Sequence, residues 1–148
     1  MFYDLPDPLD FAKQIESLLS DDGVWHVELS YMPMMIKNRS YDTICHEHLE
    51  YYSVGVIKKM LKKHGLRIFN YEINKVNGGS SVFYICYEYN KSRSQFKKIN
   101  KILAEESKLK LDKVRTYKNF YRNIKILGKK IRIKLNSILK KNKTIHGY

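Results

Sequence analysis

The chain has 148 residues, of which 43% are hydrophobic, and its 28 Lys and Arg against 15 Asp and Glu give a formal net charge of +13. A domain of this length can bury roughly 70% of the surface of its unfolded chain, which allows one compact core. The sequence has no run of eighteen apolar residues, carries four acids in its first twenty positions, and has two cysteines, Cys45 and Cys86, outside any Cys-x-x-Cys pair. These features argue against a transmembrane segment, a secretory signal, a disulfide framework and a structural zinc site, so we expect a cytoplasmic protein with free thiols.

The positive charge is concentrated in the C-terminal part of the chain. Residues 1–90 hold 9 Lys and Arg against 12 Asp and Glu, whereas residues 91–148 hold 19 against 3. A large positive charge favours nucleic acid or an anionic membrane as a partner, but this asymmetry assigns the basic character to the tail alone.

The first predicted element is a helix that begins at Asp7-Pro8, because an acid followed by proline is typical of a helix start. Apolar residues then recur with the 3.6-residue period of an amphipathic helix until Asp21-Asp22-Gly23. Residues 24–31 are rich in β-branched and aromatic side chains, which predicts a strand that ends at Met32-Pro33.

A second helix is predicted to begin at Ser53, a favourable N-cap residue, and to stop at Gly65. Residues 66–73 and 81–87 have the composition of two further strands. Because Asn77-Gly78-Gly79 lies between them, we expect the two strands to form an antiparallel hairpin.

From Lys91 onward, apolar residues recur at intervals of three and four, which predicts a long basic helix with breaks at residues 107–110 and at Gly128. Residues 144–148 depart from this pattern and predict the opening of another strand.

The order helix, strand, helix, strand, loop, strand is typical of the second half of an open α/β sheet with an antiparallel edge hairpin. Nothing before residue 7 supplies the first strand, the glycine-rich turn or the later acidic residue of a nucleotide-binding α/β domain, and Gly78-Gly79 does not take that role. The predicted fold class is therefore α/β, with the first half of the sheet missing and a long basic helix at the end.

Four ionisable side chains follow one another at Cys45, His46, Glu47 and His48, between a predicted strand and a predicted helix. Loops in this position carry the functional sites of many α/β proteins. In an extended segment His46 and His48 would share one face, and Cys45 and Glu47 the other. A carboxylate can orient a histidine, and histidine suits general-base chemistry near neutral pH, so the cluster is predicted to be catalytic or substrate-binding.

Other interpretations of these residues stay open. Histidines and glutamates often have only structural roles, and Cys45 can be a small buried thiol. A metal site is the least favoured interpretation, because four consecutive side chains cannot all turn toward one ion and no partner ligands occur at zinc spacing. The remaining histidines are interpreted as ordinary surface or core residues: His26, His64 and His146.

Four short segments carry a resemblance to a known family: residues 1–7 (MFYDLPD), 28–34 (ELSYMPM), 41–53 (YDTICHEHLEYYS) and 76–80 (VNGGS). Together they resemble the S-adenosylmethionine-dependent sugar-nucleotide C-methyltransferases, which are class I methyltransferases with a Rossmann-like sheet. The resemblance covers about residues 1–88, and residues 144–148 (TIHGY) are similar to the start of that family's C-terminal domain. The His-Glu-His signature with its flanks is its most specific part.

The resemblance implies methyl transfer from S-adenosylmethionine to a ring carbon next to the keto group of a deoxysugar nucleotide. Such a reaction needs a base for the proton alpha to the carbonyl and a donor for the enolate oxygen. By this analogy His48 is the base, and Glu47 and His46 orient it or the sugar. Many members of the resembled family carry tyrosine where this chain has Cys45, so a hydroxyl donor is expected to be lost there. The substrate-binding residues implied by the resemblance are Tyr31, Cys45, Asn77, Gly78 and Gly79.

The family also implies three parts, namely a zinc-binding module, a methyltransferase domain with a glycine-rich cofactor loop, and a C-terminal α/β domain. By this pattern residues 1–90 are a partial methyltransferase domain without the cofactor loop, residues 91–143 are a basic helical linker, and residues 144–148 begin a truncated C-terminal domain. Met1 matches an internal methionine of the family, so we expect a fragment from a partial reading frame. Such a fragment is expected to bind no S-adenosylmethionine and to be inactive alone.

The basic tail leaves a second class of function open. The main interpretation of the tail is a linker helix with a solvated charged face and an apolar stripe that packs on a neighbouring domain. The alternatives are a basic interaction or nucleic-acid-binding protein that uses the tail, although no specific nucleic-acid motif is present, and association with an anionic membrane. An exposed apolar stripe also predicts self-association through the tail helix.

Overall fold

A computed structural model describes residues 2–91, 93 and 95–147, except for the side chain of Asn77. The chain forms two compact units, Met1–Leu111 and Asp112–Tyr148. Met1 and Tyr148, which belong to two of the family-like segments, lie outside the described residues.

The first unit opens with a single 3-10 turn, η1 (Phe2–Asp4), followed by helix α1 (Pro8–Leu18). The side chain of Asp7 accepts hydrogen bonds from the backbone amides of Leu9 and Asp10 at 3.1 and 2.9 Å. These amides belong to the first turn, where no helical carbonyl can reach them. The predicted helix start is confirmed.

Strand β1 (Trp25–Ser30) is followed almost at once by helix α2 (Met32–Asn38), where the sequence predicted only the end of a strand. Pro33 is tolerated there because it lies in the first turn of the helix. The helix ends at Asn38 and is followed by Arg39, which has a left-handed conformation with φ 58°. Helix α2 has seven residues, too few to display a helical period in the sequence.

Helix α3 (Val54–Lys62) begins as predicted, with the hydroxyl of Ser53 accepting a hydrogen bond from the amide of Val56 at 3.3 Å. The chain then passes through Gly65, whose φ of 65° suits glycine. Three residues of α3 are buried against the sheet: Val54, Ile57 and Leu61.

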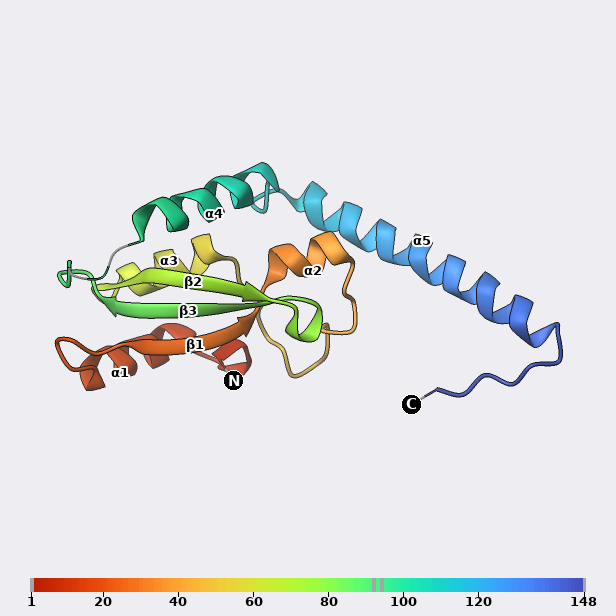
Figure 1. The fold of residues 1–148 in the computed structure, drawn as a ribbon, viewed down its shortest axis with the longest axis horizontal. Helices are drawn as coiled ribbons and strands as arrows, with labels where there is room; N and C mark the ends of the chain where they lie inside the picture. The colour runs from red at the N-terminus through yellow and green to blue at the C-terminus, as the bar shows by residue number, and fades with distance from the viewer. Residues whose placement is uncertain (1, 92, 94, 148) are drawn as a thin grey trace. The chain divides into compact units, whose positions relative to one another are not determined.

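The sheet has three strands in the order β1-β3-β2, with β3 (Ser80–Tyr87) in the centre (Figure 1). Strand β2 (Leu66–Asn74) and β3 are joined through the 3-10 turn η2 (Val76–Gly78) and run antiparallel, which confirms the predicted hairpin. Strand β1 is also antiparallel to β3, so β1 and β2 are parallel to each other and α3 lies between them in the chain. The mixed α/β character of the fold is thus confirmed.

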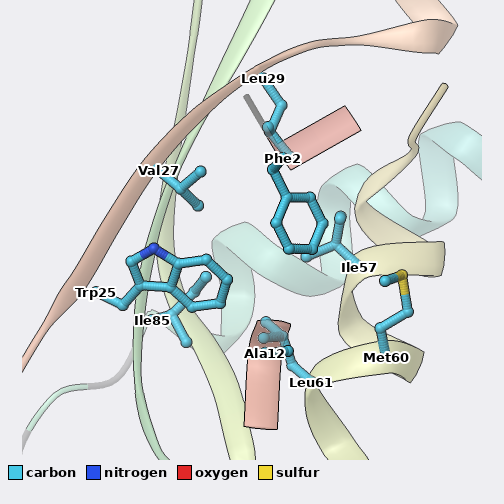
Figure 2. A pocket seen from close by; sticks show the side chains of 9 residues that line it. All are labelled: Phe2, Ala12, Trp25, Val27, Leu29, Ile57, Met60, Leu61 and Ile85. Atoms are coloured by element: carbon cyan, nitrogen blue, oxygen red, sulfur yellow. The ribbon is translucent and has the colours of Figure 1, made fainter. Parts of the chain in front are cut away.

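The core lies where β1 and β3 meet α1, α3 and η1. Figure 2 shows Trp25, Val27 and Leu29 of β1 and Ile85 of β3 close to Ala12, Phe2, Ile57, Met60 and Leu61. The space left among these side chains is about 10 Å³, close to that of one water molecule, so the core is closely packed. The other face of β1 carries the exposed residues His26 and Glu28.

Helix α4 (Phe96–Lys108) belongs to the first unit and adds Ile99 and Ile102 to the same core. The residues that follow α4, 109–113, are not helical, which confirms the predicted break near residues 107–110. The basic segment therefore contains one helix that contributes to the core before the second unit begins.

The second unit contains helix α5 (Val114–Leu139), which has 26 residues. The predicted break at Gly128 is wrong, because the helix continues through this residue. A glycine in a helix interior costs only about 1 kcal/mol relative to alanine, which does not end a helix of this length. The predicted strand opening is not found at residues 144–147, which form no strand, and Tyr148 lies outside the described residues.

Candidate functional site

The predicted cluster lies in the loop between α2 and α3, and this loop is held to the rest of the first unit by backbone hydrogen bonds. The amides of Leu49 and Glu50 donate to the carbonyl of Tyr3 at 3.1 and 3.3 Å. The amide of Met32 donates to the carbonyl of Tyr52 at 3.1 Å. Because Tyr3 and Tyr52 are both buried, these bonds fix the loop from two sides.

The cluster itself forms a turn and not an extended segment. The amide of His48 donates to the carbonyl of Cys45 at 3.3 Å, and His46 and Glu47 lie at the tip of the turn. Their side chains are 92% and 71% exposed, with His46 Nε2 3.8 Å from Glu47 Oε1. The segment is therefore not extended, and the shared face that an extended backbone would give His46 and His48 does not apply.

His48 is half-buried, and one of its ring nitrogens has a defined partner. Its Nδ1 lies 2.8 Å from the carbonyl oxygen of Thr43. A carbonyl can only accept, so Nδ1 carries a hydrogen and the lone pair of the neutral ring is on Nε2. The orientation and the tautomer of His48 are thus set by Thr43 and not by Glu47.

Two tyrosine rings flank His48. The ring centroids of Tyr3 and His48 are 4.4 Å apart in an edge-on arrangement, and those of Tyr51 and His48 are 6.2 Å apart. The Tyr51 hydroxyl also donates to the carbonyl of Thr43, at 3.3 Å. Burial raises the pKa of both tyrosines above its ordinary value, so both keep their hydroxyl protons at neutral pH.

The structure brings three of the predicted substrate-binding residues next to the partners of His48. Tyr31, Gly78 and Gly79 line the same region as Thr43 and Tyr51, and this region has no room for a water molecule. The amide of Tyr31 donates to the carbonyl of Gly79 at 3.0 Å, which ties the end of β1 to the β2–β3 turn. Cys45 is half-buried and free, whereas the side chain of Asn77 lies outside the described part of the chain.

The two glycines allow close packing at this turn. A Cβ added at Gly79, whose φ is 133°, would lie 2.7 Å from the Cβ of Met34 in α2. A Cβ added at Gly78 would lie 2.7 Å from the hydroxyl oxygen of Ser40. Both positions therefore require glycine, because a Cβ would clash with Ser40 or Met34. The space beside the turn is filled by the protein's own atoms.

A buried carboxylate that the sequence did not reveal lies beside Tyr31. Glu106 of α4 is 6% exposed and accepts a hydrogen bond from the hydroxyl of Tyr31 at 2.8 Å. It also accepts from the backbone amides of Val54 and Gly55 at 2.7 and 2.9 Å. An anion is favourable at the first turn of α3, because the amide dipoles of a helix point their positive ends toward its start.

The side chain of Tyr31 is thus committed to the protein itself. It is 3% exposed, and its burial together with the Glu106 carboxylate raises its pKa strongly above the ordinary value. Next to it lies a cavity of about 270 Å³, slightly smaller than the roughly 300 Å³ at which typical ligand pockets begin. The cavity is lined mainly by apolar side chains with a few charged ones, including Tyr31, Met34, Lys37, Ile102, Glu105 and Glu106.

The free energy of unfolding is expected to fall as the pH rises above 10. The pKa values of Tyr31 and Tyr52 are both raised in the folded chain from an ordinary value of 10.0, by burial first and then by Glu106 and Glu50 respectively. Above pH 10 the unfolded chain loses these protons while the folded chain keeps them. The stabilisation contributed by these two tyrosines is therefore complete below that pH and is lost progressively above it. Urea unfolding between about pH 8 and about pH 11 measures this fall.

The variant Tyr31→Phe, which cannot ionise at this position, is expected to show a shallower fall above pH 10. Tyr121→Phe on the exposed surface of α5 is the matched control and should follow the original chain. An equal slope for Tyr31→Phe and the original chain would show that Tyr31 does not contribute.

Comparison with known proteins identifies the family. A family model described as the C-methyltransferase C-terminal domain matches residues 75–148. The chain is also 30% identical over 152 residues to C-methyltransferase NovU of Streptomyces niveus. The chain belongs to the S-adenosylmethionine-dependent C-methyltransferase family. The match includes 99% of this chain but 35% of the Streptomyces protein, so this chain spans about a third of that relative's length.

Membership of the family implies S-adenosylmethionine as the methyl donor, but the described residues do not fit this cofactor. Its nucleotide end is typically held by a glycine-rich turn with open backbone amides before a helix. In this chain the Gly78–Gly79 turn leads into a strand and is filled by Ser40 and Met34. No group of three or more His, Cys, Asp or Glu that could hold a metal ion occurs in the described part of the chain.

Proposed function

We propose that this chain forms the acceptor side of a C-methyltransferase that methylates a ring carbon beside the keto group of a deoxysugar nucleotide, with His48 as the general base. The observation that carries the proposal is the 2.8 Å contact between His48 Nδ1 and the carbonyl of Thr43. It leaves Nε2 as the basic atom of a ring held at a half-buried position. The family membership supplies the reaction type, and the resemblance of residues 41–53 supplies the substrate class.

The proton-transfer step uses only residues of this chain. The bond between the carbon alpha to the keto group and its hydrogen breaks, and a new N–H bond forms at His48 Nε2. The electron pair of the broken bond moves into the enolate, where negative charge develops on the oxygen. The imidazolium that results is stabilised because its Nδ1–H already donates to Thr43, whose carbonyl needs no rearrangement.

His46 and Glu47 are proposed to contact the sugar and not to orient His48. Both side chains are exposed at the tip of the turn, and Glu47 is paired with His46. Tyr51 is the proposed hydroxyl donor for the enolate oxygen, taking the role of the tyrosine that family members carry at position 45; for this its hydroxyl turns from the carbonyl of Thr43 to the substrate. Its ring lies beside His48 and its hydroxyl stays protonated at neutral pH.

The sheet is proposed to be the C-terminal half of a Rossmann-like methyltransferase sheet. In the described residues β1 pairs only with β3, so its other edge is available to a further strand. The parallel arrangement of β1 and β2 around α3 supports this assignment. Under this proposal residues 1–90 belong to the methyltransferase domain, residues 91–143 link it to the C-terminal domain with α4 packed on the core of the first unit, and residues 144–148 belong to the C-terminal domain.

The 148-residue chain by itself is expected to show no heat of S-adenosylmethionine binding and no methyl transfer. The reason is that the Gly78–Gly79 turn is filled by protein atoms and offers no open amides to a nucleotide. Isothermal titration calorimetry with S-adenosylmethionine measures this directly. Micromolar binding would contradict the proposal that this chain supplies only the acceptor side.

A further inference from the structure

Helix α5 has an unusual distribution of charge. Its 26 residues, Val114–Leu139, include eight Lys and Arg and no Asp or Glu. No intrahelical acid can therefore neutralise these cations by pairing at i and i+4. The helix is a source of positive potential along its whole length.

The apolar residues of α5 form a seam along the helix. They recur at intervals of four and three, which places them on one side of the helix: Tyr117, Tyr121, Ile124, Ile131, Leu135 and Ile138. Gly128 occupies the one remaining position of this repeat. Several of the side chains are exposed in the described structure, including Tyr121 at 59% and Ile131 at 50%.

Cations border this seam at regular intervals. Lys118, Lys125 and Arg132 each follow a seam residue directly, seven residues apart, and all three are exposed. In a coiled coil of two copies these positions would flank the interface, where like charges repel. Gly128 would also leave a gap in such an interface. The pattern therefore disfavours a second copy of the chain as the partner of the seam.

We propose that α5 binds to the surface of an anionic lipid bilayer, lying in the plane of the interface. The seam would enter the boundary between headgroups and acyl chains, while the bordering Lys and Arg reach the lipid phosphates with their long stems. Charge complementarity selects this partner, because the helix has no acid to be repelled by an anionic surface. A nucleic acid would also attract the cations but would leave the apolar seam in water. None of the described helices is long and apolar enough to cross the bilayer.

The experiment is co-sedimentation of the complete 148-residue chain with lipid vesicles. We expect binding to mixed phosphatidylcholine–phosphatidylglycerol vesicles, weaker binding as salt increases above about 0.1 M, and little binding to phosphatidylcholine alone. The triple variant Lys118→Gln, Lys125→Gln, Arg132→Gln should weaken binding on the order of 100-fold, since each surface cation contributes roughly fivefold. Glutamine keeps the helix propensity of these positions.

A matched control uses the basic face of α3. The triple variant Lys58→Gln, Lys59→Gln, Lys62→Gln removes the same number of charges from exposed positions of a helix whose apolar face is buried. It should leave vesicle binding unchanged, and an equal loss in this control would overturn the proposal in favour of a diffuse charge effect.

A second variant separates lipid from nucleic acid. Tyr121→Gln, Ile131→Gln, Leu135→Gln removes apolar surface from the seam without changing charge, and it should weaken vesicle binding roughly tenfold or more. Unchanged vesicle binding by this variant would overturn the proposal. So would binding to random RNA or self-association in sedimentation velocity without any binding to anionic vesicles. Circular dichroism of each variant confirms that the helix content is retained.

Discussion

Replacing His48 with alanine in an active methyltransferase that contains this chain is expected to lower kcat on the order of 100- to 10,000-fold, the usual effect of losing a general base. A suitable enzyme is C-methyltransferase NovU with its matching stretch replaced by this chain. The sharper measurement is exchange of deuterium from solvent into the carbon alpha to the keto group, because it follows proton removal without methyl transfer. This exchange should be lost together with methyl transfer.

The matched control is His26→Ala, which removes an exposed histidine on the face of β1 away from the core. It should leave both rates unchanged. Tyr51→Phe should retain exchange better than His48→Ala, since it removes the proposed donor and keeps the base. Nitrogen NMR of the 148-residue chain reports the tautomer of His48, with the proton expected on Nδ1. Unchanged exchange in His48→Ala would remove His48 from the mechanism.

Replacing Glu106 with alanine is expected to lower the free energy of unfolding by about 3–5 kcal/mol, because a buried charged acceptor is lost. Three donors lose their partner at once: the Tyr31 hydroxyl and the amides of Val54 and Gly55. Urea unfolding measures the change, with the fluorescence of Trp25 as the probe of the core.

Glu105→Ala is the matched control for this measurement, because it removes the neighbouring acid from an exposed position. It should change the free energy of unfolding by less than about 0.5 kcal/mol. Glu106→Gln, which keeps one acceptor oxygen, should have an intermediate effect. If the two alanine variants were equally stable, Glu106 would have no special role in holding α4.

The elements predicted correctly from the sequence are those defined by neighbouring residues. Asp7 and Ser53 cap the helices that follow them, and their hydrogen bonds span only two or three residues. The β2–β3 hairpin was also predicted, because two β-rich segments and a glycine turn are adjacent in the chain. Local hydrogen bonding and hydrophobic period are sufficient for these features.

The features that were missed depend on contacts distant in the sequence or on segments too short to show a period. Glu106 meets Tyr31 across 75 positions, so nothing in its basic surroundings indicated a buried acid. Helix α2 is too short for a periodic signal. The turn at His46 and Glu47 was not predicted, because four ionisable residues in a row have no apolar pattern that would show a reversal.

The sequence indicated the candidate loop but not the contacts within it. The cluster signature indicated His48, and the structure brings its partners Thr43 and Tyr51 next to Tyr31 and the two glycines. Thr43 and Tyr51 lie within the same sequence segment as His48. Their roles could not be predicted, because Thr43 contributes only its backbone carbonyl and Tyr51 is one of many tyrosines. Only the folded loop identifies what holds the histidine.

The capping of α3 by Glu106 has a consequence for how this chain can be divided. The first turn of α3 is capped by Glu106, which lies about fifty residues later in the sequence, beyond the β2–β3 hairpin. A protein synthesised from its N-terminus therefore exposes an unsatisfied helix start until α4 emerges. If a protease cut the chain between β3 and α4, Glu106 would still bind the start of α3, and Ile99 and Ile102 would still pack in the core, so the two pieces are expected to stay together.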